Sequence, residues 1–218
     1  MEGIRGKHSF EIDAARLAAW LGLCRDVLID IGTGDGRYVQ HVARAHPTCS
    51  AIGIDACREN LRSSSRTAPR NALYLIANAQ ALACELYGLA TRITINFPWG
   101  SLLEGLLDVD PGLLGGIKAI ARPGAVLEVR LNGGALASIG WSLEAGGEQV
   151  REVLGANGFA AAAPTHLNAQ ALRACPTTWA KRLAFGPDPQ ALYLHATVCG
   201  VRRRSPIQPW ADAQPALQ

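Results

Sequence analysis

Glycines 32, 34 and 36 follow an apolar run in the segment LIDIGTGDGRYV, and a helical pattern begins near Arg37. Glycines at this spacing let the backbone turn tightly and approach a ligand, and the first amides of the following helix point toward that ligand. A second apolar run, SAIGID, ends in Asp55, whose carboxylate can accept hydrogen bonds from ribose hydroxyls. The combination predicts a site for a nucleotide-like ligand at Gly32, Gly34, Gly36 and Asp55. The structural alternative is a plain turn in which Asp55 only caps the next helix.

Asp30 lies two residues before the first glycine, so the segment reads D-x-G-x-G-x-G and departs from the dinucleotide pattern G-x-G-x-x-G. This spacing resembles motif I of the class I S-adenosylmethionine-dependent methyltransferases, which we favour over NAD-binding proteins. The resemblance implies S-adenosyl-L-methionine as cofactor and S-adenosyl-L-homocysteine as product. It also implies that Asp30 faces the amino group of the methionine moiety, and that Asn78, Ala79 and Gln80 surround the adenine.

Two tryptophans lie in segments that break regular structure, Trp99 in NFPWG and Trp179 in TTWAKRLAFG. Methyltransferases of this fold place the acceptor where the fourth strand ends, which is where NFPWG falls. Enzymes that methylate the exocyclic amine of adenine carry [D/N]-P-P-[F/Y/W] there, but here the spacing from Asn96 to Pro98 is longer by one residue. Two tryptophans on loops over one face could hold a splayed base between them. Alternatively, each is a half-buried packing anchor.

The segments IDIGTGDGR, IGID, FPWGSLLE and WAKRLAFG together resemble the KamB/NpmA family of 16S rRNA (adenine(1408)-N(1))-methyltransferases, which confer aminoglycoside resistance. The similarity runs from the N-terminal segment to the last strand. It implies methyl transfer from S-adenosylmethionine to N1 of an adenosine in the decoding A site of the 30S subunit. That ring nitrogen already has an in-plane lone pair, so the reaction needs positioning and exclusion of water and no catalytic base.

The same resemblance assigns roles to individual residues. Ser101 and Thr177 would line the methionine end of the cofactor pocket. Trp99 and Trp179 would stack the flipped adenine, and the carbonyl of Pro98 is a candidate acceptor for its exocyclic amine. Phosphate contacts are expected from basic residues on two segments: Lys181, Arg182, Arg62, Arg66 and Arg70. The family carries a lysine-rich loop before the third strand where this chain has only those last three arginines, which predicts a shallower salt dependence of binding.

Three other functions remain open from the residues alone. The first is methylation of another RNA, or of the exocyclic amine. The second is methylation of a small molecule, which would proceed without ribosomes. The third is binding of RNA without catalysis, in which case the chain would not bind the cofactor.

The elements that must position these residues can be predicted from hydrophobic patterning. Strand-like apolar runs occur at 26–32, 50–55, 72–77, 92–97, 125–131, 159–164 and 191–200. Helical patterns between most of them predict a doubly wound α/β fold with a mostly parallel, seven-stranded sheet. We expect a short N-terminal hairpin, and one or two short helices inserted between the last two strands. Residues 1–201 would form a single methyltransferase domain, followed by a flexible tail over 202–218.

Composition agrees with a protein of the cytoplasm. The chain has 218 residues, 49% of them hydrophobic and 18% charged, and it shows neither an apolar run long enough for a membrane span nor a signal peptide. Its net charge of +3 is compatible with an RNA partner. Six scattered cysteines lack metal-ligand spacing, so we expect reduced thiols and no metal site. We expect a monomer with no membrane contact.

Overall fold

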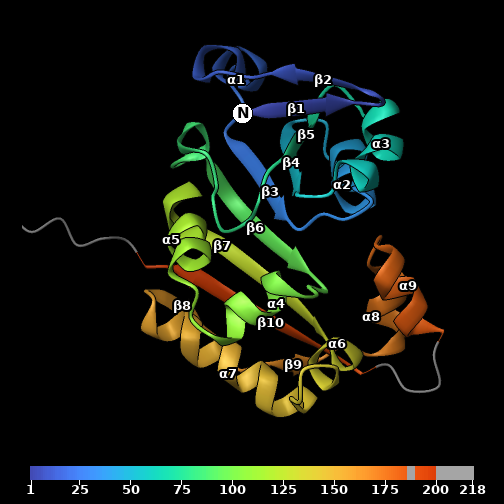
Figure 1. Ribbon diagram of the computed structural model, residues 1–218, viewed down its shortest axis with the longest axis vertical. Helices are drawn as coiled ribbons and strands as arrows, with labels where there is room; N and C mark the ends of the chain where they lie inside the picture. The colour runs from blue at the N-terminus through green and yellow to red at the C-terminus, as the bar shows by residue number, and fades with distance from the viewer. Residues whose placement is uncertain (186–189, 200–218) are drawn as a thin grey trace, which may run out of the picture.

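Buried runs of aliphatic residues form the centre of one mixed sheet in the computed structural model, which describes residues 1–185 and 190–199 (Figure 1). Ten strands follow the order β2-β1-β5-β4-β3-β6-β7-β10-β8, and β9 pairs with β10. Their bounds are β1 (Glu2–Arg5), β2 (His8–Glu11), β3 (Asp26–Ile31), β4 (Cys49–Asp55), β5 (Ala72–Ile76), β6 (Ala90–Asn96), β7 (Ala121–Asn132), β8 (Phe159–Ala161), β9 (Thr165–His166) and β10 (Ala191–Val198).

The prediction of a mostly parallel, seven-stranded sheet is wrong in the number of strands and in their direction. The pairs β3–β4, β3–β6, β4–β5 and β6–β7 are parallel, and the other pairs are antiparallel. The predicted N-terminal hairpin is confirmed as β1 and β2, but it also extends the sheet, because Gly3 of β1 pairs with Leu75 of β5. Strand β9 has two residues, which is too short to give a hydrophobic pattern.

Helices cover both faces of the sheet, as predicted for an α/β fold. Alternate residues of β3 belong to different cores: Leu28 lies in the cluster that includes residues of α2 and α3, whereas Ile29 lies in the cluster that includes residues of α4, α5 and α7. The helices are α1 (Ala14–Leu21), α2 (Arg37–Ala45), α3 (Arg58–Arg66), α4 (Ser101–Leu107), α5 (Pro111–Ile120), α6 (Gly133–Ala137), α7 (Leu143–Ala156), α8 (Ala169–Ala174) and α9 (Thr178–Ala184), with a 3₁₀ turn η1 (Cys84–Leu86). Among these described helices, none has both the length and the apolar character that crossing a membrane requires.

The predicted helical insertion is confirmed as α8 and α9, which lie between β9 and β10. Each begins at a side-chain cap: Asn168 accepts a hydrogen bond from the amide of Ala171, and Thr177 accepts one from the amide of Ala180. In Figure 1 the two helices, coloured orange, lie beyond the end of β6. Residues 186–189 and the expected tail 202–218 lie outside the described residues.

Candidate active site

A cavity of about 450 Å³ opens where β3, β4, β5 and β6 end, and it also reaches the first turn of α9. Open parallel sheets bind ligands at this edge, because the loops that follow the strands diverge there. Most of the residues predicted from the sequence to bind cofactor or base line this cavity: Asp30, Gly32, Gly34, Asp55, Asn78, Ala79, Pro98, Trp99, Ser101, Thr177 and Trp179. The structure therefore gathers into one site groups that lie up to 149 positions apart in the chain.

Gly36 does not line the cavity, but it shapes the glycine loop that does. Its φ of 71° is left-handed, and a Cβ atom there would lie 2.5 Å from the ring of Tyr74. The Tyr74 hydroxyl donates a 2.9 Å hydrogen bond to the carbonyl oxygen of Gly36. Only glycine allows both the backbone angle and this close approach, so Gly36 fixes the turn from which α2 begins.

Asp55 is held by two backbone amides at the edge of the cavity. One carboxylate oxygen accepts a 2.8 Å hydrogen bond from the Cys57 amide just before α3, and the other accepts a 2.7 Å hydrogen bond from the Gly34 amide. The side chain also lines the cavity. Each carboxylate oxygen has a second lone pair, so these contacts orient Asp55 without preventing it from accepting a ligand hydroxyl.

Asp30 is buried with one oxygen satisfied and one not. Oδ1 accepts hydrogen bonds from Thr94 Oγ1 at 2.6 Å and from Asn96 Nδ2 at 2.9 Å, whereas Oδ2 has no partner within the described part of the chain. Burial raises the pKa of Asp30 from 3.8 to about 6, against the opposing effects of the hydroxyls of Thr33 and Thr94 and of the Asn96 amide. A cationic group in the cavity would satisfy Oδ2 and favour the carboxylate.

Arg130 on β7 does not line the cavity but contacts Asn96, which does, and sequence reasoning missed this supporting residue. Its guanidinium donates hydrogen bonds to Asn96 Oδ1 at 2.8 Å and to Glu128 Oε2 at 3.1 Å, and it lies between the rings of Tyr38 and Tyr193. Arginine can only donate, so the Asn96 oxygen must face it and the Asn96 amide nitrogen must face Asp30. Arg130 thus fixes the orientation of Asn96. The only sequence signal was an arginine within an apolar strand.

The conformation of the segment after β6 explains why a proline and a tryptophan follow this buried strand. Phe97 has a left-handed φ of 54°, and its amide donates a 2.7 Å hydrogen bond to the Arg130 carbonyl. Its ring is buried in a cluster with Leu172, Cys175, Ala180, Ala184 and Ala191. The burial of this ring between β6 and the α8–α9 insertion holds a backbone conformation that is unfavourable for a large residue. The chain then turns, so that Trp99 is 41% exposed before α4 begins.

Trp99 and Trp179 lie against each other over the cavity, with ring centroids 5.2 Å apart and ring planes inclined by 30°. The structure thus brings the two predicted rings together. A planar base between two parallel rings needs about 7 Å, or two contact distances. The rings must therefore separate before a base can lie between them. The Arg182 guanidinium lies 5.2 Å from the Trp179 ring centroid, so one predicted phosphate ligand packs on a predicted stacking ring.

Asp35 and Thr178 join α9 to the glycine loop, and sequence reasoning did not select either residue. Thr178 Oγ1 donates a 2.6 Å hydrogen bond to Asp35 Oδ2, and both residues line the cavity. Thr177, which was selected, also lines the cavity while capping α9. The only available signal for Asp35 was its place between Gly34 and Gly36.

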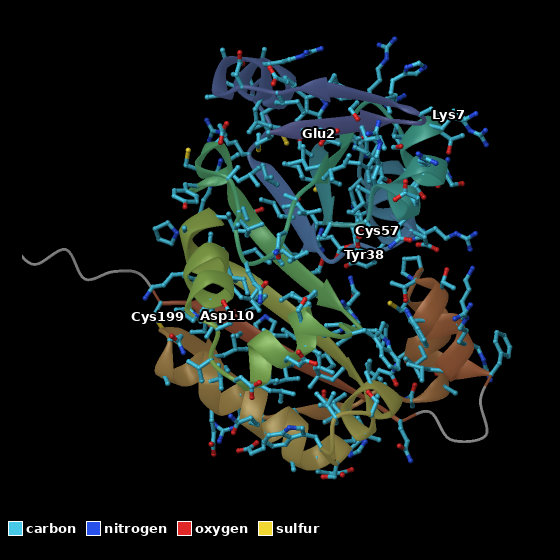
Figure 2. All side chains as sticks on the ribbon, in the orientation of Figure 1. Glu2, Lys7, Tyr38, Cys57, Asp110 and Cys199 are labelled. Atoms are coloured by element: carbon cyan, nitrogen blue, oxygen red, sulfur yellow. The ribbon has the colours of Figure 1, made fainter. Side chains whose placement is uncertain are left out.

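The remaining predicted residues lie outside the cavity. The Gln80 carboxamide donates a 3.0 Å hydrogen bond to Asp110 before α5 and does not line the site. The basic residues are exposed on two elements: Arg62, Arg66 and Arg70 on α3 and just after it, and Lys181 and Arg182 on α9. Arg62 pairs with Glu59 at 3.3 Å. Figure 2 shows Tyr38 and Cys57 near the ends of α2 and α3 that face α8 and α9.

Comparisons with known proteins agree with this geometry. Residues 2–198 match the family model described as NpmA: 16S rRNA (adenine(1408)-N(1))-methyltransferase. A protein of that name from Streptoalloteichus hindustanus is 33% identical, with 86% of this chain and 94% of the relative covered. Among solved structures, the 16S rRNA methyltransferase KamB superposes with a TM-score of 0.83 at 28% identity, covering 92% of this chain and 100% of KamB. The antibiotic-resistance methyltransferase Kmr gives 0.76 at 33% identity, covering 92% and 99%.

Proposed function

This chain belongs to the family of 16S rRNA (adenine(1408)-N(1))-methyltransferases, and we propose that it transfers a methyl group from S-adenosylmethionine to N1 of that adenosine. The observation that carries the proposal is the contact between Trp99 and Trp179 at the mouth of the cavity. Exposed aromatic rings are the usual means of holding a base that has left its helix. The proposed substrate is the intact 30S subunit in the cytoplasm. The protein would act on it as a monomer, and the methylation would confer resistance to aminoglycosides.

The lining residues suit this cofactor. S-adenosylmethionine supplies an electrophilic methyl group on a sulfonium centre. Asp30 Oδ2 is buried and has no partner among the described residues, so it could accept a hydrogen bond from the ammonium of the methionine moiety. Asp55 is positioned to accept ribose hydroxyls, and Asn78 and Ala79 lie where the adenine would be held. Ser101 and Thr177 line the same cavity as the tryptophans and would contact the methionine end of the cofactor.

In this reaction the residues of the site need only position the base and the methyl group. The N1 lone pair lies in the plane of adenine, so no proton must be removed before it attacks a methyl group. Among the described residues that line the cavity, none is a histidine, lysine or cysteine, and Asp35 is bonded to Thr178. The tryptophans would hold the base in line and exclude water, and the Pro98 carbonyl could accept its exocyclic amine.

The position of Asn96 bears on methylation of the exocyclic amine, which needs an amide or carboxylate oxygen at the end of the fourth predicted strand. Here the Asn96 oxygen accepts from Arg130, and its amide nitrogen donates to Asp30. These contacts fix the orientation of Asn96, and each end of the amide keeps one further hydrogen-bonding position. The preference for N1 therefore rests on the family match.

Primer extension across the decoding region of 16S rRNA tests the proposal. Purified 30S subunits would be incubated with the protein and S-adenosylmethionine, and a methyl on N1 would halt the polymerase because it blocks base pairing. We expect a stop at the A-site adenosine with wild type and with Trp20→Ala, a control on α1. We expect the stop to be lost with Trp99→Ala and Trp179→Ala.

Calorimetry with S-adenosylmethionine separates the possible failures. No stop despite cofactor binding would refute the substrate and leave a methyltransferase for another RNA or a small molecule, identified by turnover without ribosomes. No stop and no cofactor binding would leave a noncatalytic RNA-binding protein. In cells, expression of the wild type should raise the inhibitory concentration of aminoglycosides, and expression of Trp179→Ala should not.

A further inference from the structure

Phe185, at the end of α9, is a large aromatic residue whose side chain does not line the cavity. It is 78% exposed, more than either Trp99 or Trp179. Its neighbours on the same helix, Ala180 and Ala184, are buried against the Phe97 cluster, so α9 is held in place by its other side. A single exposed apolar side chain is common on protein surfaces, so the case for a partner at Phe185 rests on the groups that surround its ring.

The ring of Phe185 repeats an arrangement found on Trp179. The Arg173 guanidinium, from α8, lies 5.9 Å from the Phe185 ring centroid, as the Arg182 guanidinium lies 5.2 Å from that of Trp179. Arginine over an aromatic face leaves the opposite face available to a base and presents charge to the adjoining phosphate. Two such pairs therefore lie on α8 and α9.

The charge around Phe185 favours a polyanion over a protein or a second copy of this chain. The sequence from residue 153 to the end of α9 contains no aspartate or glutamate, and it places Arg173, Lys181 and Arg182 on the exposed surface. A basic surface of this kind attracts phosphate, whereas an apolar protein interface is depleted in lysine. The chemistry of the surface thus combines a stacking ring with cations.

The spacing between Trp179 and Phe185 along α9 places Phe185 near the nucleotides that flank the target adenosine. Trp179, Arg182 and Phe185 recur at every third position, so they follow the exposed side of α9 with a turn of about 60° at each step, and six residues rise by about 9 Å along the axis. The axial rise alone corresponds to two to three base steps of about 3.4 Å, and the turn around the helix adds to it, so Phe185 lies a few nucleotides from the ring that would receive the flipped base. It is close enough to meet a flanking nucleotide of the same strand.

We propose that Phe185, backed by Arg173, is a second stacking site that takes an unpaired base flanking the methylated adenosine. The inference rests on the proposed function, because it names a further contact of the same rRNA substrate. The site contributes to docking and to holding the strand beside the flipped base. It does not touch the reacting atoms.

Binding of purified 30S subunits, followed by filter retention, tests this site in three variants. Stacking on one aromatic ring corresponds to about a tenfold change in Kd or more. We expect Phe185→Leu, which keeps apolar area and loses the π-face, to weaken binding by about tenfold, and Phe185→Tyr to remain within about twofold of wild type. Leu23→Ala removes another fully exposed apolar side chain, 98% accessible and outside α8 and α9, and should bind as wild type does.

Salt dependence distinguishes stacking from ion pairing. A phosphate contact contributes to the slope of log Kd against log salt, whereas stacking of a neutral ring does not. Phe185→Leu should keep the wild-type slope, and Lys181→Gln should make it shallower by about one. Phe185→Leu that binds as wild type would overturn the proposal.

Two other results would also overturn it and name a different partner. Full affinity with Phe185→Leu together with loss in Phe185→Ser would indicate an apolar contact with a ribosomal protein. A wild-type dimer in sedimentation that Phe185→Leu dissociates would indicate a second copy of this chain. The proposed function is tested separately. It depends on the primer-extension stop produced by the wild-type protein, which does not depend on how the Phe185 variants bind.

Discussion

Asp35 Oδ2 accepts a 2.6 Å hydrogen bond from Thr178 Oγ1, across 143 positions of the chain. Asp35 belongs to the glycine loop, and Thr178 immediately precedes Trp179 in the first turn of α9. The bond therefore ties the ring that would stack the target base to the loop that would hold the cofactor. Binding at one of these places can influence the other through this connection.

Thr178→Val removes the donor with little change of shape, and Thr178→Ser keeps it. A hydrogen bond to a charged group contributes enough that its loss should lower kcat/KM for 30S subunits by about tenfold in Thr178→Val. The serine variant should retain activity. Steady-state kinetics and cofactor calorimetry measure both. Equal kcat/KM in the two variants would show that α9 is positioned by Phe97 packing alone.

The contact between Trp99 and Trp179 has a spectroscopic signature. Indole rings with centroids 5.2 Å apart couple their electronic transitions, so the free protein should show a tryptophan couplet in far-ultraviolet circular dichroism. Because the couplet belongs to the pair, Trp99→Phe and Trp179→Phe should each abolish it, and the double variant should lose nothing more. Trp20→Phe, on α1, should leave it intact. Halving of the signal in each single variant would mean that the rings are apart in solution.

Cofactor binding should weaken in acid through Asp30. The carboxylate form would pair with the ammonium of the cofactor, and burial raises the pKa of Asp30 to about 6. Affinity should therefore be level above that pH and fall by about tenfold for each pH unit below it. Calorimetry between about pH 5 and pH 8 measures this. Asp30→Asn should bind weakly, without the pH dependence.

The same group makes an opposite contribution to folding. Because the pKa of Asp30 is higher in the folded protein than its ordinary 3.8, ionisation disfavours the folded state. Its contribution to the free energy of unfolding should decrease as pH rises from about 4 to about 6, and Asp30→Asn should remove that decrease. Thermal melts of the two proteins without cofactor provide the comparison. Identical pH profiles would show that Asp30 is not buried as described.

Gly34 and Gly36 should differ sharply when replaced by alanine. Both have left-handed φ values, but a Cβ at Gly34 meets nothing within 4 Å, whereas one at Gly36 lies 2.5 Å from Tyr74. Gly34→Ala should reduce the free energy of unfolding by about 1 kcal/mol, from backbone strain alone. Gly36→Ala should cost about 3 kcal/mol, because overpacking adds to strain. Denaturant unfolding measures both, and equal losses would contradict the packing of Gly36 on Tyr74.

The core of the fold was predictable because its strands are buried on both faces. The run expected at 26–32 is β3 (Asp26–Ile31), and that expected at 72–77 is β5 (Ala72–Ile76). Continuous apolar residues of this length leave few alternatives to a central strand. The glycine loop and Asp55 were predictable for a related reason, since few residue types can make that turn and accept from a ribose.

Contacts set by the tertiary fold were not predictable. Gln80 adjoins Asn78 and Ala79 in sequence, yet a hydrogen bond to Asp110 turns its side chain away from the cavity. Arg130 is a charged residue within a strand, and Asn96, Glu128 and the rings of Tyr38 and Tyr193 surround its guanidinium. Neither placement follows from local spacing, because Asp110, Asn96 and the two tyrosines lie on other elements, and only Glu128 is a neighbour on the same strand.

The last described strand has a consequence for the order in which the protein becomes active during its own synthesis. β10 lies between β7 and the short strands β8 and β9, and its first residue, Ala191, packs with the cluster beneath α9. Until β10 has left the ribosome, the two short strands and the α8–α9 insertion have no sheet to join. The half of the molecule that carries Trp179 is therefore completed last. The nascent chain can therefore form the glycine loop before the part that carries Trp179 is complete.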